Sequence, residues 1–337
     1  MPHRNSTSGF RKTSQKEKAK GRGESVMKYC FGVDIGGTTV KMGLFESEGK
    51  ILDKWEITTD TSREGQAILP DIAASIEKKT EEHHLSREDI LGVGVGVPAP
   101  VTSAGIVNGS ANLGWKYKEV KREMEELTGF RAEIGNDANV AALGEMWKGG
   151  GAGRKNIVMV TLGTGVGGGV IIDGKILVGQ NGAGGEIGHL CVNYEETDTC
   201  GCGNRGCLEQ YASATGIVRL AKKKLGEELR PTTLKKEDIT AKAVFDAVKA
   251  GDETAREIAV EFGKYLGYAL ANIAVVTDPD AFVIGGGVSK AGEVLIPFIR
   301  EPYMEKAFFA NKKVDFVLAT LGNDAGICGA AKLVLDA

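Results

Sequence analysis

Short apolar runs alternate with amphipathic stretches along the chain. Residues 90–97 and 157–162 are nearly continuous apolar runs, which are typical of buried strands. Residues 68–80 and 254–276 instead repeat apolar positions every three or four residues, as helices with one buried face do. Further strands are predicted at 29–34, 40–45, 169–172, 281–284, 314–319 and up to Ile134, and further helices at 120–127, 140–147, 241–250, near 291–296 and at 325–335. This alternation predicts an α/β architecture.

One pattern occurs twice in the chain. Residues 33–52 and 160–177 each read as a strand, a polar glycine turn, a second strand and a hairpin turn, and each ends in Gly-Lys-Ile-Leu. Two equivalent hairpins, one in each domain, would clasp a ligand between the domains. Chance similarity between glycine-rich hairpins is the alternative.

The length and net charge of the chain limit its expected number of domains and its expected partners. A chain of 337 residues exceeds the roughly 250–300 at which a single core stops growing, which favours two domains. The net charge of −3 gives no electrostatic reason to bind nucleic acid, and no apolar run reaches the ~18 residues of a membrane span. We therefore expect neither nucleic acid nor a membrane as a partner.

The first 26 residues carry seven Lys or Arg against two Glu, with almost no apolar residues. This composition favours a disordered basic tail over an arm that contacts nucleic acid. The segment lacks the apolar core of a secretory signal, so we expect a cytoplasmic protein with reduced thiols. Clustered cysteines in such a compartment indicate metal or redox chemistry.

Glycine is the unusual residue, with 48 in the chain, concentrated in short loops. Such loops let backbone N–H groups approach phosphate oxygens closely. One loop follows Asp34, which could hold Mg²⁺ through water, and a third glycine run would let a flat base or ribose lie against the backbone. Neither of the first two loops is a P-loop, because a strand follows instead of a helix; plain hairpin turns are the alternative. The predicted ATP contacts are Asp34, Gly36, Gly37, Thr38, Thr39, Lys41, Gly163, Thr164, Gly165, Gly286 and Gly287.

An acid stands between a predicted strand and the helix that follows it. Asn136 and Asp137 are of the residue types that cap helices, and capping is the alternative interpretation. The same edge of an α/β sheet is where ligands bind. In phosphoryl transfer a carboxylate there orients the attacking hydroxyl and accepts its proton. Asp137 is therefore the predicted catalytic base.

Three cysteines and a histidine have the spacing of a metal site. Cys200, Cys202 and Cys207 with His189 suit a closed tetrahedral Zn²⁺ site of structural type, with a redox cysteine pair as the alternative. Glu186 and Glu209 flank this group, and carboxylates are strong acceptors for sugar hydroxyls. His189 could bind zinc through one ring nitrogen and a hydroxyl through the other. Glutamates without a ligand are the alternative.

Together these motifs resemble the ROK family of sugar kinases and repressors, from Met27 to the end of the chain. The resemblance implies an actin-like ATPase fold of the ribonuclease H-like class, with two α/β domains and an interdomain cleft. It also implies phosphorylation of a hexose at its 6-hydroxyl by ATP, with glucose favoured, and frequent homodimers. Its implied roles are Asp137 as base, Asn112, Asn136, Asp137, Glu186, His189 and Glu209 as sugar contacts, and His189, Cys200, Cys202 and Cys207 as zinc ligands. One departure is Ala99, where the family commonly has glycine.

The expected organisation has three parts. Residues 27–135 form an N-terminal α/β domain, residues 136–323 form a larger α/β domain with the zinc loop, and a helix at about 324–337 packs back on the first domain. A kinase for fructose, mannose, allose or an N-acetylhexosamine is one alternative. A sugar-responsive repressor is another, but no helix-turn-helix pattern precedes Asp34. A sugar-binding protein without turnover would not require both phosphate loops.

Overall fold

The computed structural model describes residues 27–227 and 231–337. Its first five-stranded sheet has the order β3-β2-β1-β4-β7. Strand β2 is antiparallel to β1 and β3, whereas β4 and β7 run parallel to β1. These strands are β1 (Tyr29–Ile35), β2 (Thr39–Glu46), β3 (Ile51–Thr58), β4 (Ile90–Val97) and β7 (Ala132–Asn136).

The second sheet repeats this topology in the order β10-β9-β8-β11-β12. Again an antiparallel three-strand unit is followed by two parallel strands. The strands are β8 (Ile157–Leu162), β9 (Val166–Ile172), β10 (Lys175–Ile176), β11 (Ala281–Gly285) and β12 (Asp315–Leu318). The repeated sequence pattern therefore marks equivalent hairpins, β1–β2–β3 and β8–β9–β10.

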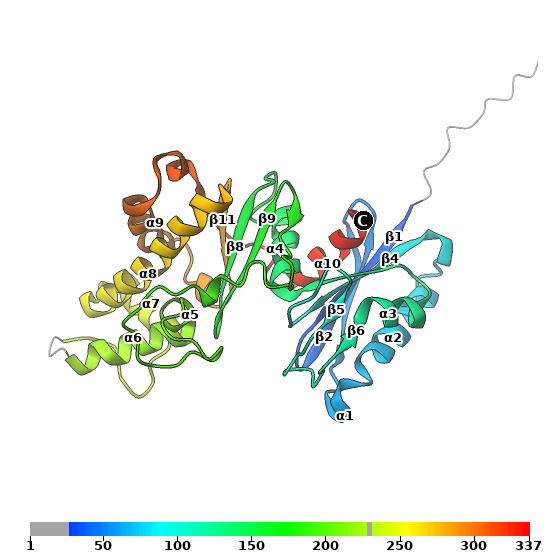
Figure 1. The fold of residues 1–337 in the computed structure, drawn as a ribbon, viewed down its shortest axis with the longest axis horizontal. Coiled ribbons are helices and arrows are strands. Elements are labelled where there is room, and N and C mark those ends of the chain that lie inside the picture. Colours follow the sequence, from blue (N-terminus) through cyan, green and yellow to red (C-terminus); the bar gives the residue numbers. More distant parts are fainter. Residues whose placement is uncertain (1–26, 228–230) are drawn as a thin grey trace, which may run out of the picture.

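The first sheet is covered on both faces, as Figure 1 shows. Helices α2 (Ile68–Glu82) and α3 (Val120–Thr128) bury one face, and α10 (Ala325–Leu335) buries the other. Helix α10 comes very close because β1 and β4 have glycines beneath it. A Cβ on Gly94 would lie 1.7 Å from the carbonyl oxygen of Ala330, and one on Gly32 would lie 2.1 Å from that of Ile327.

Helices of the second half gather mostly on one side of the second sheet (Figure 1). They are α5 (Glu209–Ala212), α6 (Ala214–Glu227), α7 (Ala241–Lys249), α8 (Glu253–Thr277) and α9 (Leu295–Lys306). Helix α4 (Asp137–Lys148) covers the opposite face. Short elements complete the description: α1 (Ser62–Gly65), β5 (Ile106–Val107), β6 (Lys118–Glu119) and the 3₁₀ turns η1 (Arg87–Asp89), η2 (Ile187–His189), η3 (Val288–Ala291), η4 (Phe309–Lys313) and η5 (Gly322–Asp324).

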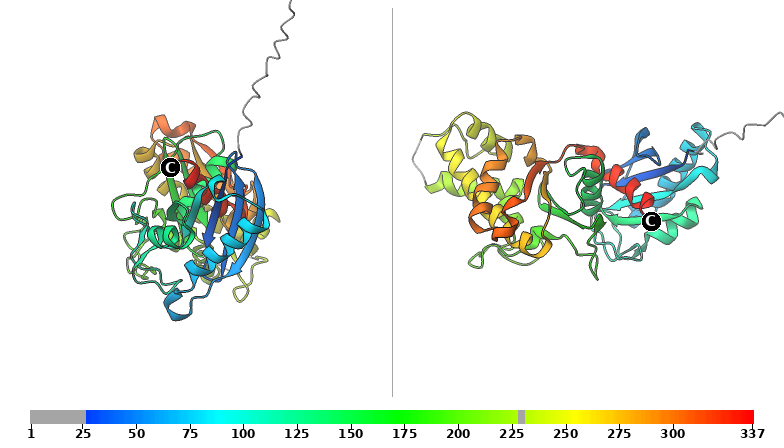
Figure 2. Two further views of the ribbon diagram at one scale, coloured as in Figure 1. Left: turned by 90° about the vertical axis from the view of Figure 1, so that its right-hand side faces the viewer. Right: turned by 90° about the horizontal axis from the view of Figure 1, so that it is seen from above.

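Helices α4 and α10 join the two halves of the molecule (Figure 2). Their contact also depends on small residues, since a Cβ on Gly329 would lie 1.7 Å from the carbonyl oxygen of Val140. Helix α10 therefore packs on the first sheet and on α4 at once. The division of the chain at residue 136 stays a prediction, and the predicted tail at 1–26 lies outside the described residues.

One predicted helix differs from the structure. The helix predicted near 291–296 does not form as one unit: η3 ends at Ala291, the φ of 81° at Gly292 interrupts the helical path, and α9 begins only at Leu295. Helix α6 and the edge strand β3 were not predicted. Across residues 27–227 and 231–337, no helix combines the length and the apolar character needed to cross a membrane.

Candidate active site

The junction of β7 and α4 places the predicted base. Asn136 caps α4, because its Oδ1 accepts a hydrogen bond from the Asn139 N–H at 3.1 Å. Its Nδ2 donates to the Ala99 carbonyl at 3.2 Å and to Oδ1 of Asp137 at 3.1 Å. The capping interpretation is thus correct for Asn136, and the cap also holds the Asp137 carboxylate at the carboxyl end of β7.

Asp137 has the electrostatics of a proton acceptor. Burial raises its pKa to about 6, and repulsion from the carboxylates of Asp34 and Glu186 contributes in the same direction. A hydrogen bond of 2.8 Å from the Ala138 N–H opposes that rise. A carboxylate with this pKa is ionised at neutral pH and can still take up a proton readily.

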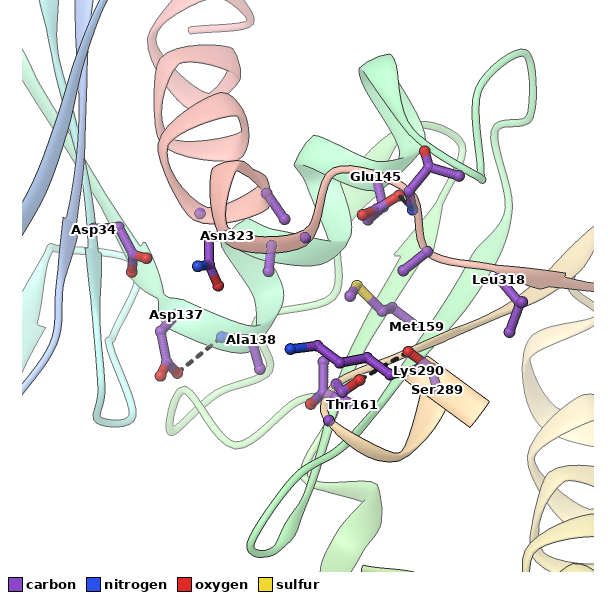
Figure 3. Close-up of a pocket in the computed structure, with 18 of the residues that line it drawn as sticks. Asp34, Asp137, Ala138, Glu145, Met159, Thr161, Ser289, Lys290, Leu318 and Asn323 are labelled. Carbon is purple, nitrogen blue, oxygen red and sulfur yellow. Dashed lines mark hydrogen bonds between the residues drawn. The ribbon is translucent and has the colours of Figure 1, made fainter. Parts of the chain in front are cut away.

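A cavity of about 550 Å³ opens beside Asp137 between the two halves of the molecule (Figure 3). Lys290, in η3, extends its ammonium group into it toward Ala138. Its lining comes from both sheets and from the start of α10: Asp34, Lys41, Asp137, Ala138, Ala141, Glu145, Met159, Thr161, Gly286, Gly287, Ser289, Lys290, Leu318, Ala319, Thr320, Gly322, Asn323, Ala325 and Gly326. Gly286, with a φ of 84°, forms part of the backbone wall.

Asp34 is the last residue but one of β1 and lines this cavity. It pairs across the sheet with Lys41 of β2, and the start of α10 packs on it, since a Cβ on Gly326 would lie 2.4 Å from its Oδ2. Burial raises the pKa of Asp34, whereas the charge of Lys41 lowers it. A carboxylate is the type of side chain through which proteins hold Mg²⁺, directly or through water.

A second cavity, also of about 550 Å³, lies on the other side of Asp137. Five of the predicted sugar contacts line it, namely Asn112, Asn136, Asp137, Glu186 and Glu209. Ala99, where the family commonly has glycine, lines it too. Asp137, Thr161 and Gly286 line both cavities. The carboxylate of Asp137 therefore stands at the boundary between two compartments.

The loop carrying Glu186 is held by a residue for which the sequence indicated no role. Asn139 of α4 is buried, and its Nδ2 donates to the Gly184 carbonyl at 3.3 Å. There is little free space at this contact, because a Cβ on Gly185 would lie 3.1 Å from Oδ1 of Asn139. Asn139 thus connects the position of Glu186 to the helix that begins with Asp137.

The predicted metal ligands converge. The ligand atoms of His189, Cys200, Cys202 and Cys207 all lie within 4.8 Å of one another, and the sulfurs of Cys202 and Cys207 are 3.6 Å apart. Two sulfurs bound at about 2.3 Å to a tetrahedral zinc ion lie about 3.8 Å apart, so the four residues fit Zn²⁺. Two are buried and two are exposed.

The carboxylates of Glu186 and Glu209, which flank this group in the sequence, both lie close to the His189 ring. Its Nε2 lies 4.0 Å from Glu186, and its Nδ1 lies 3.8 Å from Glu209. Glu209 also accepts a hydrogen bond of 2.8 Å from the Cys200 thiol. His189 does not itself line the second cavity, which is the sugar-side cavity of the predicted site, but it lies next to Glu186 and Glu209, which do.

The predicted phosphate loops are the β1–β2 and β8–β9 turns. Gly163 and Gly165 line the second cavity, and Thr164 lines a third one beside the cysteine loop. The residues of the first turn, Gly36, Gly37, Thr38 and Thr39, line none of these three cavities. That turn lies beside the sugar-side cavity, because a Cβ on Gly37 would be 3.8 Å from Cβ of Asn112.

Sequence reasoning missed Thr161 and Asn323 as well as Lys290 and Asn139. Lys290 carried a usable signal, since it is the first cation after the Gly285-Gly286-Gly287 run expected to face the nucleotide. Thr161 sits at an inward position of β8 next to the predicted turn. Asn323 reaches the cavity because α10 packs back on the first sheet. That packing is predicted, but no local pattern indicates that Asn323 itself lines a cavity.

Residues 30–337 match the model of the ROK family. The chain is 44% identical to a glucokinase of Halalkalibacterium halodurans over 91% of its own length and 95% of that protein. It is 38% identical to a glucokinase of Thermotoga maritima over 91% of its own length and 97% of that protein. Its fold matches that of a ROK glucokinase of Streptomyces griseus, solved with glucose and AMPPNP, with a TM-score of 0.71. The two sequences are 33% identical, and the match covers 92% of this chain and 100% of that one.

The solved relative shares the fold described above, which is that of the actin-like ATPases. The family match at residues 30–337 includes every residue that lines the three cavities described above. The chain belongs to the ROK family.

Proposed function

We propose that this protein is a glucokinase, which transfers the γ-phosphoryl group of ATP to the 6-hydroxyl of glucose. The observation that carries the proposal is the position of Asp137, shared by two cavities and raised in pKa by burial. A kinase needs one carboxylate that reaches the sugar hydroxyl and faces the nucleotide. The glucokinase relatives support this assignment.

In the proposed reaction, Asn112, Asn136, Glu186, His189 and Glu209 hold the sugar. Asp137 hydrogen-bonds the 6-hydroxyl and accepts its proton while the new oxygen–phosphorus bond forms. The bond between the γ-phosphorus and the bridging oxygen breaks, and ADP leaves with that oxygen. The proton then passes from Asp137 to solvent when the cleft opens.

The nucleotide is proposed to occupy the first cavity, with its base or ribose against Gly286 and Gly287. Asp34 would hold Mg²⁺, which supplies charge neutralisation for the phosphates when bound. Gly36, Gly37, Thr38, Thr39 and Lys41 would approach the phosphates from one sheet, and Gly163, Thr164 and Gly165 from the other. Closure of the two halves would bring these turns together and exclude water.

Zinc is proposed to act only as a structural ion, held by His189, Cys200, Cys202 and Cys207. Four protein ligands leave no open position for water, so the ion would stabilise the loop between Glu186 and Glu209. We further propose a cytoplasmic homodimer. A reducing compartment suits the free thiols of the group.

The sugar preference is tested with ATP and a panel of hexoses in a coupled assay for ADP. We expect kcat/KM for glucose to exceed the values for fructose, mannose, allose and N-acetylglucosamine by at least about tenfold, because lost hydroxyl contacts in a built polar site are costly. A different preferred hexose would correct the substrate. Sugar binding without turnover of any hexose would overturn the kinase assignment.

The pH profile tests the role of Asp137. Protonation removes its capacity to accept a proton, so we expect kcat/KM to fall as the pH drops below about 6, by about tenfold per pH unit. The measurement is the initial rate between pH 4.5 and 8 at saturating Mg²⁺. The residual rate of Asp137→Asn should lack this acidic limb; an identical limb in that variant would assign the titration to another group.

A further inference from the structure

The loop that carries the metal ligands has a second attachment to the protein, made without any of those ligands. Residues 193–198 lie between His189 and Cys200, and the side chain of Glu196 within them is only 6% exposed. A nearly buried carboxylate is stable only where hydrogen bonds or charges compensate for the lost hydration. The partners of Glu196 therefore show what this segment is attached to.

Both carboxylate oxygens of Glu196 accept hydrogen bonds. Its Oε1 accepts hydrogen bonds of 2.9 Å from the N–H groups of Thr197 and Asp198. Its Oε2 accepts one from the Tyr211 hydroxyl and one of 2.5 Å from the Arg219 guanidinium. Burial alone would raise the pKa of Glu196, but these hydrogen bonds and the charge of Arg219 lower it to about 2. The carboxylate is therefore ionised throughout the working range of pH.

The partners of Glu196 come from helices. Tyr211 lies in α5, and its ring stacks on Tyr265 of α8 with centroids 4.0 Å apart. The guanidinium group of Arg219, in α6, lies over the Tyr211 ring, 5.4 Å from its centroid. Asn193 adds a hydrogen bond of 2.8 Å to the Tyr211 hydroxyl. The loop is thus attached to α5 through Tyr211 and to α6 through Arg219, and the Tyr211 ring connects it to α8.

This tyrosine is two residues from Glu209, which begins α5. Helix α5 has only four residues, too few to hold its first side chain by helical hydrogen bonds alone. Cys207, two residues before Glu209, belongs to the metal-ligand group, and Tyr211, two residues after it, belongs to the Glu196 cluster. The position of Glu209 is therefore fixed on one side by the metal-ligand group and on the other by the hydrogen bonds of the Glu196 cluster.

We propose that Glu196, Tyr211 and Arg219 are positioning residues that orient Glu209 toward the sugar, independently of the metal. This inference rests on the proposed function, since Glu209 is one of its sugar contacts. None of the three residues lines the sugar-side cavity, so none would touch the sugar itself.

The test compares Glu196→Gln and Tyr211→Phe with matched controls. Tyr211→Phe keeps the ring stack on Tyr265 and removes only the hydroxyl, and Glu196→Gln keeps the shape and removes the charge. The controls are Glu195→Gln and Tyr194→Phe, two neighbours that are exposed, Tyr194 by 89%. For each purified protein we would measure kcat, both KM values, glucose binding by calorimetry, zinc content and Tm.

We expect the KM and Kd for glucose to rise about five- to twentyfold in both test variants, a range typical of a lost charge-assisted hydrogen bond. The KM for ATP should stay within about twofold and the zinc content should not change, and the controls should match the unmodified protein. A purely structural role would lower Tm and weaken ATP and glucose binding together, and that result would overturn the proposal.

The two hypotheses fail in different ways. If the unmodified protein phosphorylates glucose and Glu196→Gln binds glucose equally well, the positioning role is wrong and the kinase assignment stands. If the unmodified protein has no kinase activity, both are wrong. Should Tyr211→Phe not fold, Glu196→Gln decides alone, because it preserves the size of the buried side chain.

Discussion

Asp137→Asn is expected to lower kcat for glucose phosphorylation by about 10²- to 10⁴-fold, the usual contribution of a positioned general base. The amide has nearly the same size as the carboxylate but cannot take up the proton of the 6-hydroxyl. Its neighbours should stay in place, because the cap of α4 is made by Asn136 and not by Asp137. Both KM values should therefore change much less than kcat.

The control for this variant is Asp173→Asn. Asp173 is an exposed aspartate in the turn after β9, with a φ of 52° that asparagine tolerates well. Steady-state kinetics with glucose and ATP should show normal turnover for the control. Near-normal kcat in Asp137→Asn would remove the base from the proposed reaction, even if glucose phosphorylation itself were demonstrated.

Cys202→Ser is expected to raise the KM for glucose at least about tenfold while leaving the KM for ATP within about twofold. Cys202 is exposed, so the change costs little packing and acts mainly through the loss of one thiolate ligand. Without the ion, His189 and the segment up to Cys207 lose the constraint that fixes Glu186 and Glu209. The first cavity, in which the nucleotide is proposed to bind, contains none of the four ligands.

Zinc analysis accompanies these kinetics. The unmodified protein should carry about one zinc per chain, and the variant less than about half. Cys191→Ser is the matched control, because Cys191 is exposed and adjoins the same loop but lies outside the group of four. Equal losses of glucose and ATP binding in Cys202→Ser would mean that the metal supports the whole domain and not the sugar site in particular.

Much of this arrangement could be predicted from the sequence, because its signals are local. The metal group depends on residues brought together by one short loop with glycines, and the β7–α4 junction is visible as a strand followed by Asn136-Asp137. The equivalent hairpins were also visible, since the turn chemistry is repeated. In each case, neighbouring residues determine the geometry.

The parts that could not be predicted depend on contacts between distant segments. The packing of the last helix on the first domain is predicted, but nothing in the sequence places the Asn323 side chain in the first cavity. Nor does the sequence indicate that Asn139 holds the loop at Gly184. The Glu196 cluster combines residues of the loop with α5, α6 and α8, and helix α6 itself was not predicted. A single sequence contains no pattern for such pairings.

The close packing of α10 on Gly32 and Gly94 has a consequence for the synthesis of the protein. Domains usually fold in order as the ribosome produces them. Here one face of the first sheet stays uncovered until the entire second sheet has been translated, because α10 follows it in the chain. During that interval the apolar residues beneath α10, among them Cys30 and Phe45, are accessible to solvent. The first sheet is therefore expected to complete its packing only after α10 has left the ribosome.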